Sequence, residues 1–206
     1  MDLTKNGSAV PASSARAGTA SGRTSSRRLG RSDWVDAALR ALAVGGLGSL
    51  SVERLATELG ATKGSFYWHF KNRSALVDEA LREWERRDTD HLIDRASEID
   101  DPRERLGWLF RVVFSDAAGV GIDTALLADA EDPVVAAALE RVATKRLSYM
   151  EAQYKLMGVQ AASDRAVLTY TAFVGLAQLR RTTPSLAPQG RRSTRYLANI
   201  TQLLID

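Results

Sequence analysis

Apolar residues recur every three or four positions along most of the chain after residue 31, which is the spacing of one face of a helix. No stretch alternates apolar and polar residues with a period of two, so we predict an all-α fold without a sheet. Ser32, Ser51 and Thr62 are expected to cap the first three helices, since a hydroxyl oxygen can accept from a free backbone N–H of the first turn. The predicted helices span 32–45, 52–59, 62–70, 74–96, 102–114, 122–130, 133–158, 162–182 and 191–204.

The first 30 residues differ in composition: they are rich in Ser, Ala, Gly, Thr and Arg and hold almost no large apolar side chain. Such a segment cannot bury enough surface to offset the entropy of ordering, so we expect it to be disordered. Residues 1–31 carry six basic side chains and one acidic one, which gives +5, whereas the whole chain has a net charge of +3. A basic arm ahead of the first helix favours a polyanion partner, although a solvated leader fits the same composition.

The composition also excludes several kinds of site. The 206-residue chain has no cysteine and only two histidines, His69 and His91, which rules out disulfide scaffolds, thiolate metal sites and a three-histidine site in one chain. His91 has helical spacing to Asp88 and Asp94, but an exposed polar face is the favoured interpretation, and we expect no metal and no cofactor. No apolar run approaches the ~20 residues that span a bilayer, and no secretory signal is evident. We therefore expect a cytoplasmic protein without a membrane partner.

The second and third predicted helices flank a tight turn at Gly60, which is the arrangement of a helix-turn-helix. At about 100° per residue, Phe66 and Phe70 share the core face of the third helix, and Trp68 points away from it. A large aromatic residue aimed outward from a short helix is unusual in a closed bundle and favours a binding surface. Many helical bundles contain such turns, however, so this pattern alone is not specific.

The run from Ser51 to Leu81 reads SVERLATELG, ATKGSFYWHF and KNRSALVDEAL, and it resembles the DNA-binding domain of TetR-family transcriptional regulators. Its most specific part is FYWHFKNR, from Phe66 to Arg73, and the resemblance covers about residues 32–85 by motif. With it we divide the chain into a disordered basic arm over 1–30, a helix-turn-helix DNA-binding domain over 31–75, and a helical ligand-binding and dimerisation domain over 76–206.

The resemblance implies a set of DNA-binding residues. Tyr67 is expected to contact a phosphate, as is His69, and Trp68 to touch bases or methyl groups; Arg73 stands where the family commonly has Lys and implies a phosphate clamp. Glu53 is an acid on this surface, so it either faces away from DNA or accepts from a cytosine amino group. The implied DNA-binding residues are Ser51, Val52, Thr62, Lys63, Gly64, Ser65, Tyr67, Trp68, His69, Lys71 and Arg73, with Thr62, Lys63 and Ser65 at base edges or nearby phosphates.

Each of these roles has a purely structural alternative. Tyr67 and Trp68 can pack on neighbouring helices with their polar atoms at the surface. Lys71 and Arg73 can be solvated charges. Phe66 is assigned to the core rather than to DNA.

For residues 102–206, the resemblance implies an effector pocket lined by aromatic side chains, although residues at helical spacing are more often core. The candidate ligand-binding residues are Trp108, Phe114, Tyr149, Tyr154, Tyr170 and Phe173, with Asp123, Thr124 and Gln153 as polar candidates. The helices at 162–182 and 191–204 are expected to pair with those of a second subunit in a four-helix interface. A charge at Leu176 or Leu203 is then expected to disrupt the core or this interface.

These features together predict a homodimeric DNA-binding transcriptional regulator, a repressor released from a palindromic double-stranded operator by a small-molecule effector. A ligand-independent DNA-binding protein is the alternative. A helical-bundle enzyme is disfavoured, because the sequence holds no nucleophile–base motif, Gly-rich phosphate loop or metal cluster. The identity of the effector does not follow from the sequence.

Overall fold

The computed structural model describes residues 29–115 and 117–205, so the arm predicted over 1–30 lies outside the described residues except for its last two positions. The predicted helices are present and no strand occurs among the described residues, which confirms the all-α fold. In chain order the elements are α1 (Arg31–Gly45), the 3₁₀ turn η1 (Gly46–Ser49), α2 (Val52–Glu58), α3 (Lys63–His69), α4 (Arg73–Glu85), the π-helical turn η2 (Arg86–Asp90), α5 (His91–Ser97), α6 (Pro102–Ser115), α7 (Ala117–Leu127), α8 (Pro133–Leu156), α9 (Ala162–Thr182) and α10 (Arg191–Ile205).

Two of the three predicted helix caps are confirmed. The side chains of Ser51 and Thr62 accept from backbone N–H groups three residues later, at 3.4 and 3.2 Å, and so start α2 and α3. The cap predicted at Ser32 is wrong, because α1 begins one residue before it and Gly30 is the N-cap. The Asp33 carboxylate takes the capping role instead, since it accepts from the Gly30 N–H at 2.7 Å.

The single helix predicted over 74–96 is helical throughout but contains an irregularity. Five residues of it, 86–90, form a π-helical turn between α4 and α5. Turns of this kind interrupt α-helices rarely and occur often at functional sites. In η2, Thr89 is buried between neighbouring helices.

The bounds predicted for the helix at 122–130 are wrong. The glycines at 119 and 121 were expected to break the chain, yet α7 begins at Ala117, runs through both and ends at Leu127. Gly121 faces α1, where a Cβ would make ordinary van der Waals contact with the Ala43 Cβ, 3.6 Å away. Packing of α7 on α1 and α9 outweighs the low helix propensity of glycine, which costs about 1 kcal/mol per residue.

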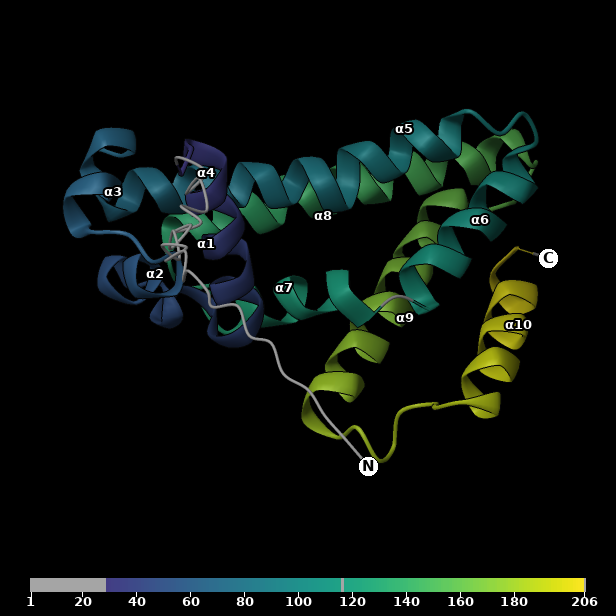
Figure 1. Cartoon of the computed structure of the whole chain (residues 1–206). Coiled ribbons are helices and arrows are strands. Elements are labelled where there is room, and N and C mark those ends of the chain that lie inside the picture. Colours follow the sequence, from purple (N-terminus) through teal and green to yellow (C-terminus); the bar gives the residue numbers. More distant parts are fainter. Residues whose placement is uncertain (1–28, 116, 206) are drawn as a thin grey trace, which may run out of the picture.

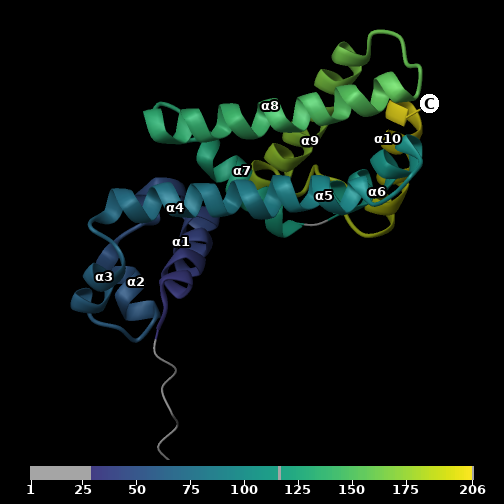
Figure 2. The ribbon, with the colours of Figure 1, turned by 90° about the horizontal axis from the view of Figure 1, so that it is seen from above.

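The helices form an elongated bundle with the helix-turn-helix at one end. Figure 1 shows α1, α2 and α3 grouped around the start of α4. The rod formed by α4, η2 and α5 leads from there to α6, and α8 runs beside it (Figure 2). At the other end α9 packs on α8, and α10 packs on α6. No helix in the described part of the chain is long and apolar enough to cross a membrane.

Two hydrophobic clusters hold this arrangement together. The first centres on Trp34, Phe66 and Trp84 and also includes Leu126 of α7 and Val142 of α8. The second joins α6, α8, α9 and α10 around aromatic residues such as Phe110 and Tyr154. Because the first cluster continues across residue 75 into α7 and α8, the division at that position remains a proposal.

Candidate nucleic-acid interface and ligand cavity

Helix α3 presents one buried and one exposed aromatic face, as predicted. Phe66 and Phe70 are fully buried, and the Phe66 ring meets that of Trp34 edge-on at 5.3 Å. On the other side, the side chains of Tyr67 and Trp68 are 61% and 89% exposed. Neither Tyr67 nor Trp68 is buried against a neighbouring helix, so the surface of α3 is available to a partner.

Two hydroxyl groups along this surface already form hydrogen bonds within the protein. Thr62 and Ser51 cap their helices with their oxygens, and the Ser51 hydroxyl also donates to Glu53 Oε2 at 2.9 Å. Gly64 is exposed, and Ser65 is half-buried in the first turn of α3. The predicted residues of 62–69 therefore lie together on one short helix, next to the start of α2.

An ion pair joins α2 to α3 across this surface. Lys63 Nζ lies 2.5 Å from Glu53 Oε1, and both side chains are 59% exposed. The hydrogen bond from Lys63, supported by the backbone N–H of Glu53 and by Ser51, lowers the pKa of Glu53 to about 2. The same bond raises the pKa of Lys63. Glu53 thus does not turn away from the surface, but engages a residue predicted to contact DNA.

Arg73 has a structural role that the sequence did not reveal. Its Nε donates to the Leu50 carbonyl and its Nη2 to the Leu47 carbonyl, each at 2.6 Å. These bonds fix the corner between η1 and α2 to the first residue of α4. A phosphate clamp at Arg73 would have to use the remaining N–H groups of the guanidinium. Lys71, two residues earlier, is exposed to solvent.

Arg31 does not belong to a free basic arm. It is the first residue of α1, where its Nε donates to Glu79 of α4 at 2.8 Å and its Nη1 donates to the His69 carbonyl. The guanidinium also lies over the Phe70 ring, 4.3 Å from its centroid. Arg31 therefore ties the end of α3 to α1 and α4, and the His69 ring beside it is half-buried.

A cavity of about 630 Å³ lies where α1, the rod of α4, η2 and α5, and helices α6 to α9 meet. Most of its wall is apolar or aromatic, as is usual for small-molecule sites. The lining residues are Asp36, Leu39, Arg40, Ala43, Trp84, Arg87, Asp88, Thr89, Leu92, Ile93, Leu109, Phe110, Val112, Val113, Phe114, Ile122, Asp123, Arg146, Tyr149, Met150, Thr169, Tyr170 and Phe173.

Four of the six aromatic residues predicted for the pocket line this cavity, namely Phe114, Tyr149, Tyr170 and Phe173. Trp108 and Tyr154 do not. The Tyr154 ring is fully buried in the second core cluster and its hydroxyl bonds to Thr169 Oγ1 at 2.7 Å. Trp108 is half-buried on α6, with the guanidinium of Arg95 over its ring at 5.3 Å.

Of the three polar candidates, only Asp123 lines the cavity. Gln153 is buried next to α6, where its Oε1 accepts from Arg105 Nη1 at 2.8 Å. The Thr124 hydroxyl lies 3.4 Å from the Gly121 carbonyl, to which it donates within α7.

The sequence analysis missed Arg146, one of three arginines in the cavity wall. Its Nη1 donates to Asp123 Oδ1 at 2.7 Å, and its Nε donates to Thr89 Oγ1 at 3.0 Å. A signal was present: Arg146 stands midway between Val142 and Met150, four residues from each, on the buried stripe of α8. A charge at such a position needs a buried partner.

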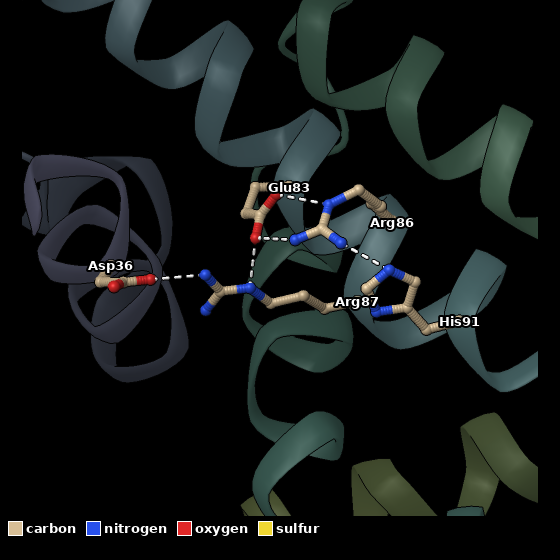
Figure 3. Close-up of polar contacts among 5 residues, drawn as sticks. All are labelled: Asp36, Glu83, Arg86, Arg87 and His91. Carbon is tan, nitrogen blue, oxygen red and sulfur yellow. Dashed lines mark hydrogen bonds and ion pairs between the residues drawn. The ribbon is translucent and has the colours of Figure 1, made fainter. Parts of the chain in front are cut away.

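A second missed group connects the cavity to α1. Arg87 of η2 reaches Asp36 of α1, with Nη2 2.6 Å from Oδ1, and also bonds to Glu83 (Figure 3). Arg86 donates to the same Glu83 carboxylate, with Nε 2.8 Å from Oε2, and its Nη1 lies 2.5 Å from His91 Nε2. His91 thus belongs to an arginine–carboxylate network.

Within the described part of the chain, no group of three or more His, Asp or Glu side chains is placed to hold a metal ion. The candidate site therefore consists of an exposed helix surface and a separate cavity. The Asp36–Arg87 ion pair, which lines the cavity, joins α1 to the rod.

Comparison with known proteins identifies the helix-turn-helix. Residues 35–80 match the family described as "Bacterial regulatory proteins, tetR family". The class D tetracycline repressor protein of Escherichia coli is 38% identical over 71 residues, which cover 34% of this chain and 33% of the repressor. The aligned part is thus about a third of each protein, whereas the α3 surface described above lies within the family match at residues 35–80.

Over most of its length, the chain resembles solved structures in fold, at low sequence identity. A TetR-family transcriptional regulator from Agrobacterium tumefaciens has a TM-score of 0.68 at 17% identity, covering 85% of this chain and 95% of that chain. FadR from Bacillus subtilis, whose structure holds stearoyl-CoA, has a TM-score of 0.66 at 12% identity, covering 86% and 98%. Residues 35–80 are thus a helix-turn-helix of the tetR family, and the described chain as a whole shares the fold of TetR-family regulators.

Proposed function

We propose that this chain is a homodimeric transcriptional repressor that binds a palindromic operator and leaves it when a small molecule occupies the cavity. Residues 31–75 are assigned to DNA binding and residues 76–206 to effector binding and dimerisation. The observation that carries the proposal is the exposed pair Tyr67 and Trp68 beside Lys63, on a helix inside the matched segment. A related protein is named as a repressor, and a structural neighbour holds stearoyl-CoA.

The α3 surface suits a DNA groove. Basic and hydroxyl groups in the first turn of α3 can donate to base edges or phosphates, whereas the Tyr67 hydroxyl can donate to a phosphate oxygen. Trp68 offers an apolar edge to a thymine methyl group. The predicted DNA contacts at 51–73 remain part of this proposal.

Replacing Tyr67 with alanine is expected to weaken binding of all duplexes by about tenfold, because a phosphate contact carries no sequence information. Lys63→Ala is expected to weaken operator binding and also to change sequence preference. Fluorescence anisotropy on the operator and on a scrambled duplex measures both effects. Tyr67→Phe, which keeps the ring and loses only the hydroxyl, is the matched control and should reproduce most of the loss. Unchanged operator affinity in Tyr67→Ala and Lys63→Ala would refute the assignment.

Glu53 is expected to limit non-specific binding. Its carboxylate neutralises Lys63 in the free protein and repels phosphate, so Glu53→Gln should tighten binding to scrambled duplexes about threefold to tenfold. The released lysine should also steepen the dependence of log affinity on log salt by about 0.9. Glu58→Gln makes the same charge change on α2 but breaks a pair with Arg40, 2.7 Å away, and is the control. Equal effects of the two changes would mean that net charge alone acts.

The proposed dimer interface lies mainly on α9. Its solvent-facing stripe contains Leu168, Gly175 and Leu179, which are apolar or small and lie seven and four residues apart, with the exposed Val167 next to Leu168. The outward face of α10 is mostly polar, since its apolar face packs on α6, and Leu203 is its exposed exception. In the proposed four-helix interface, α9 therefore contributes more apolar surface than α10.

A further inference from the structure

The charged side chains that line the cavity include a largely buried ion pair. Arg146 and Asp123 form that pair, with Nη1 and Oδ1 2.7 Å apart and only 14% and 12% of the two side chains exposed. The Arg146 guanidinium also donates to Thr89 Oγ1 and to the Asp88 carbonyl, at 3.0 and 3.1 Å. The Phe173 ring lies 5.6 Å from this guanidinium. The positive charge in the cavity wall is thus already neutralised by the protein.

The other ionisable groups of the described lining keep the same balance. Arg87 is paired with Asp36 at 2.6 Å, and Arg40 is paired with Glu58 of α2 at 2.7 Å. The described lining residues hold three aspartates and three arginines, and the rest are uncharged. The formal charges of the lining thus balance, and each of its three arginines is already paired with a carboxylate of the protein.

We propose that the effector is an uncharged, mainly aromatic or aliphatic molecule whose hydrogen-bond acceptor takes an N–H of Arg146. This inference rests on the proposed function and names the ligand class of its cavity. An anion would compete with Asp123 for Arg146 and leave a buried carboxylate without its partner, and a cation would do the reverse to Arg146. A neutral ligand leaves the pair intact.

The donors for such a ligand lie in the wall. The bonds described above use three of the five N–H groups of Arg146, and the Tyr170 hydroxyl interacts with the same guanidinium, which leaves at most one further N–H for a ligand. Tyr170 lines the cavity near Arg146, and burial raises the pKa of its phenol, so it stays protonated and uncharged at neutral pH. A carbonyl or ether oxygen fits these donors.

Two fluorescent dyes with one skeleton test the proposal without DNA. N-phenyl-1-naphthylamine is neutral, and 8-anilino-1-naphthalenesulfonate adds one negative charge. The neutral dye is expected to bind the unmodified chain at least about tenfold more tightly, a difference of about 1.4 kcal/mol. Tighter or equal binding of the sulfonate would overturn the proposal. Acridine and cationic 9-aminoacridine give the same comparison for positive charge, and a preference for the cation would equally contradict it.

Val113→Trp, which fills the cavity, locates the bound dye. Val113 lines the cavity and is half-buried. The larger ring is expected to weaken binding of the neutral dye by about tenfold or more, since a filled pocket cannot hold it. Unchanged affinity would place the dye on another surface and remove the support for this cavity.

Asp123→Asn tests the role of the buried pair directly. The amide oxygen can still accept from Arg146, but the negative charge is gone, so the ratio of sulfonate affinity to neutral-dye affinity should rise about tenfold. Asp94→Asn on exposed α5 is the matched control and should change neither affinity. Retained neutral-dye binding shows that Asp123→Asn is folded, and an unchanged preference in that folded variant would overturn the inference. Operator binding is measured separately, so its failure would contradict the proposed function and leave the dye result standing.

Discussion

Leu168→Glu is expected to turn the proposed dimer into monomers and to weaken operator binding by about 1,000-fold, the lower end of the gap between specific and non-specific DNA binding. Leu168 is 58% exposed on the outward stripe of α9, where it makes few contacts within its own chain. In a two-fold interface the same residue contributes from both subunits, so one substitution buries two like charges. A monomer would then reach only one half-site.

Light scattering and operator anisotropy together check this result. Leu156→Glu is the control, because Leu156 is also an exposed leucine, 67% exposed, but lies at the end of α8. It should remain dimeric and bind the operator normally. Leu176, one of the two sites named from the sequence, is buried in the second core cluster, so a charge there is expected to lower the melting temperature of the subunit itself. A dimeric Leu168→Glu protein would place the interface elsewhere.

Asp36→Asn is expected to uncouple operator binding from effector binding. Asp36 in α1 and Arg87 in η2 both line the cavity, so a ligand there meets the ion pair that joins the DNA-binding end to the rod (Figure 3). A ligand shifts the equilibrium between two protein conformations only through interactions that differ between them. We expect the Asp36–Arg87 contact to be such an interaction. Allosteric coupling is typically 5–150-fold, and we expect the variant to reduce a response of about 100-fold to below about tenfold.

The measurement is the operator affinity with and without a neutral ligand that both raises the melting temperature and releases the unmodified chain. Ligand-free operator affinity and ligand affinity should each stay within about threefold, which separates lost coupling from lost binding. Glu151→Gln, which breaks an exposed pair with Lys155 within α8, is the control. A full response in Asp36→Asn would show that the signal travels by another route.

Local features explain what the sequence predicted well. The caps at Ser51 and Thr62, and the buried positions of Phe66 and Phe70, depend on residues within four positions along the chain. The exposed state of Trp68 follows from the same helical spacing. These short-range rules were sufficient to place the α2–α3 surface.

Features that depend on distant contacts were not predictable in the same way. Trp108 and Phe114 lie on the same helix, yet only Phe114 lines the cavity, because the packing of seven other elements decides which ring faces the cavity. The Arg146–Asp123 pair joins α8 to α7, and the Asp36–Arg87 pair joins residues 51 positions apart. Such pairings follow from the tertiary fold rather than from periodicity.

Selection of bound sequences from a random duplex library, followed by anisotropy titration of the selected duplex, tests the central claim most directly. We expect a palindrome with half-sites centred about one helical turn or a multiple of it apart, roughly 10 bp per turn. The unmodified chain should bind it at least about 1,000-fold more tightly than a scrambled duplex, and a neutral cavity ligand should reduce that affinity. Equal affinity for the selected and scrambled duplexes would contradict the account.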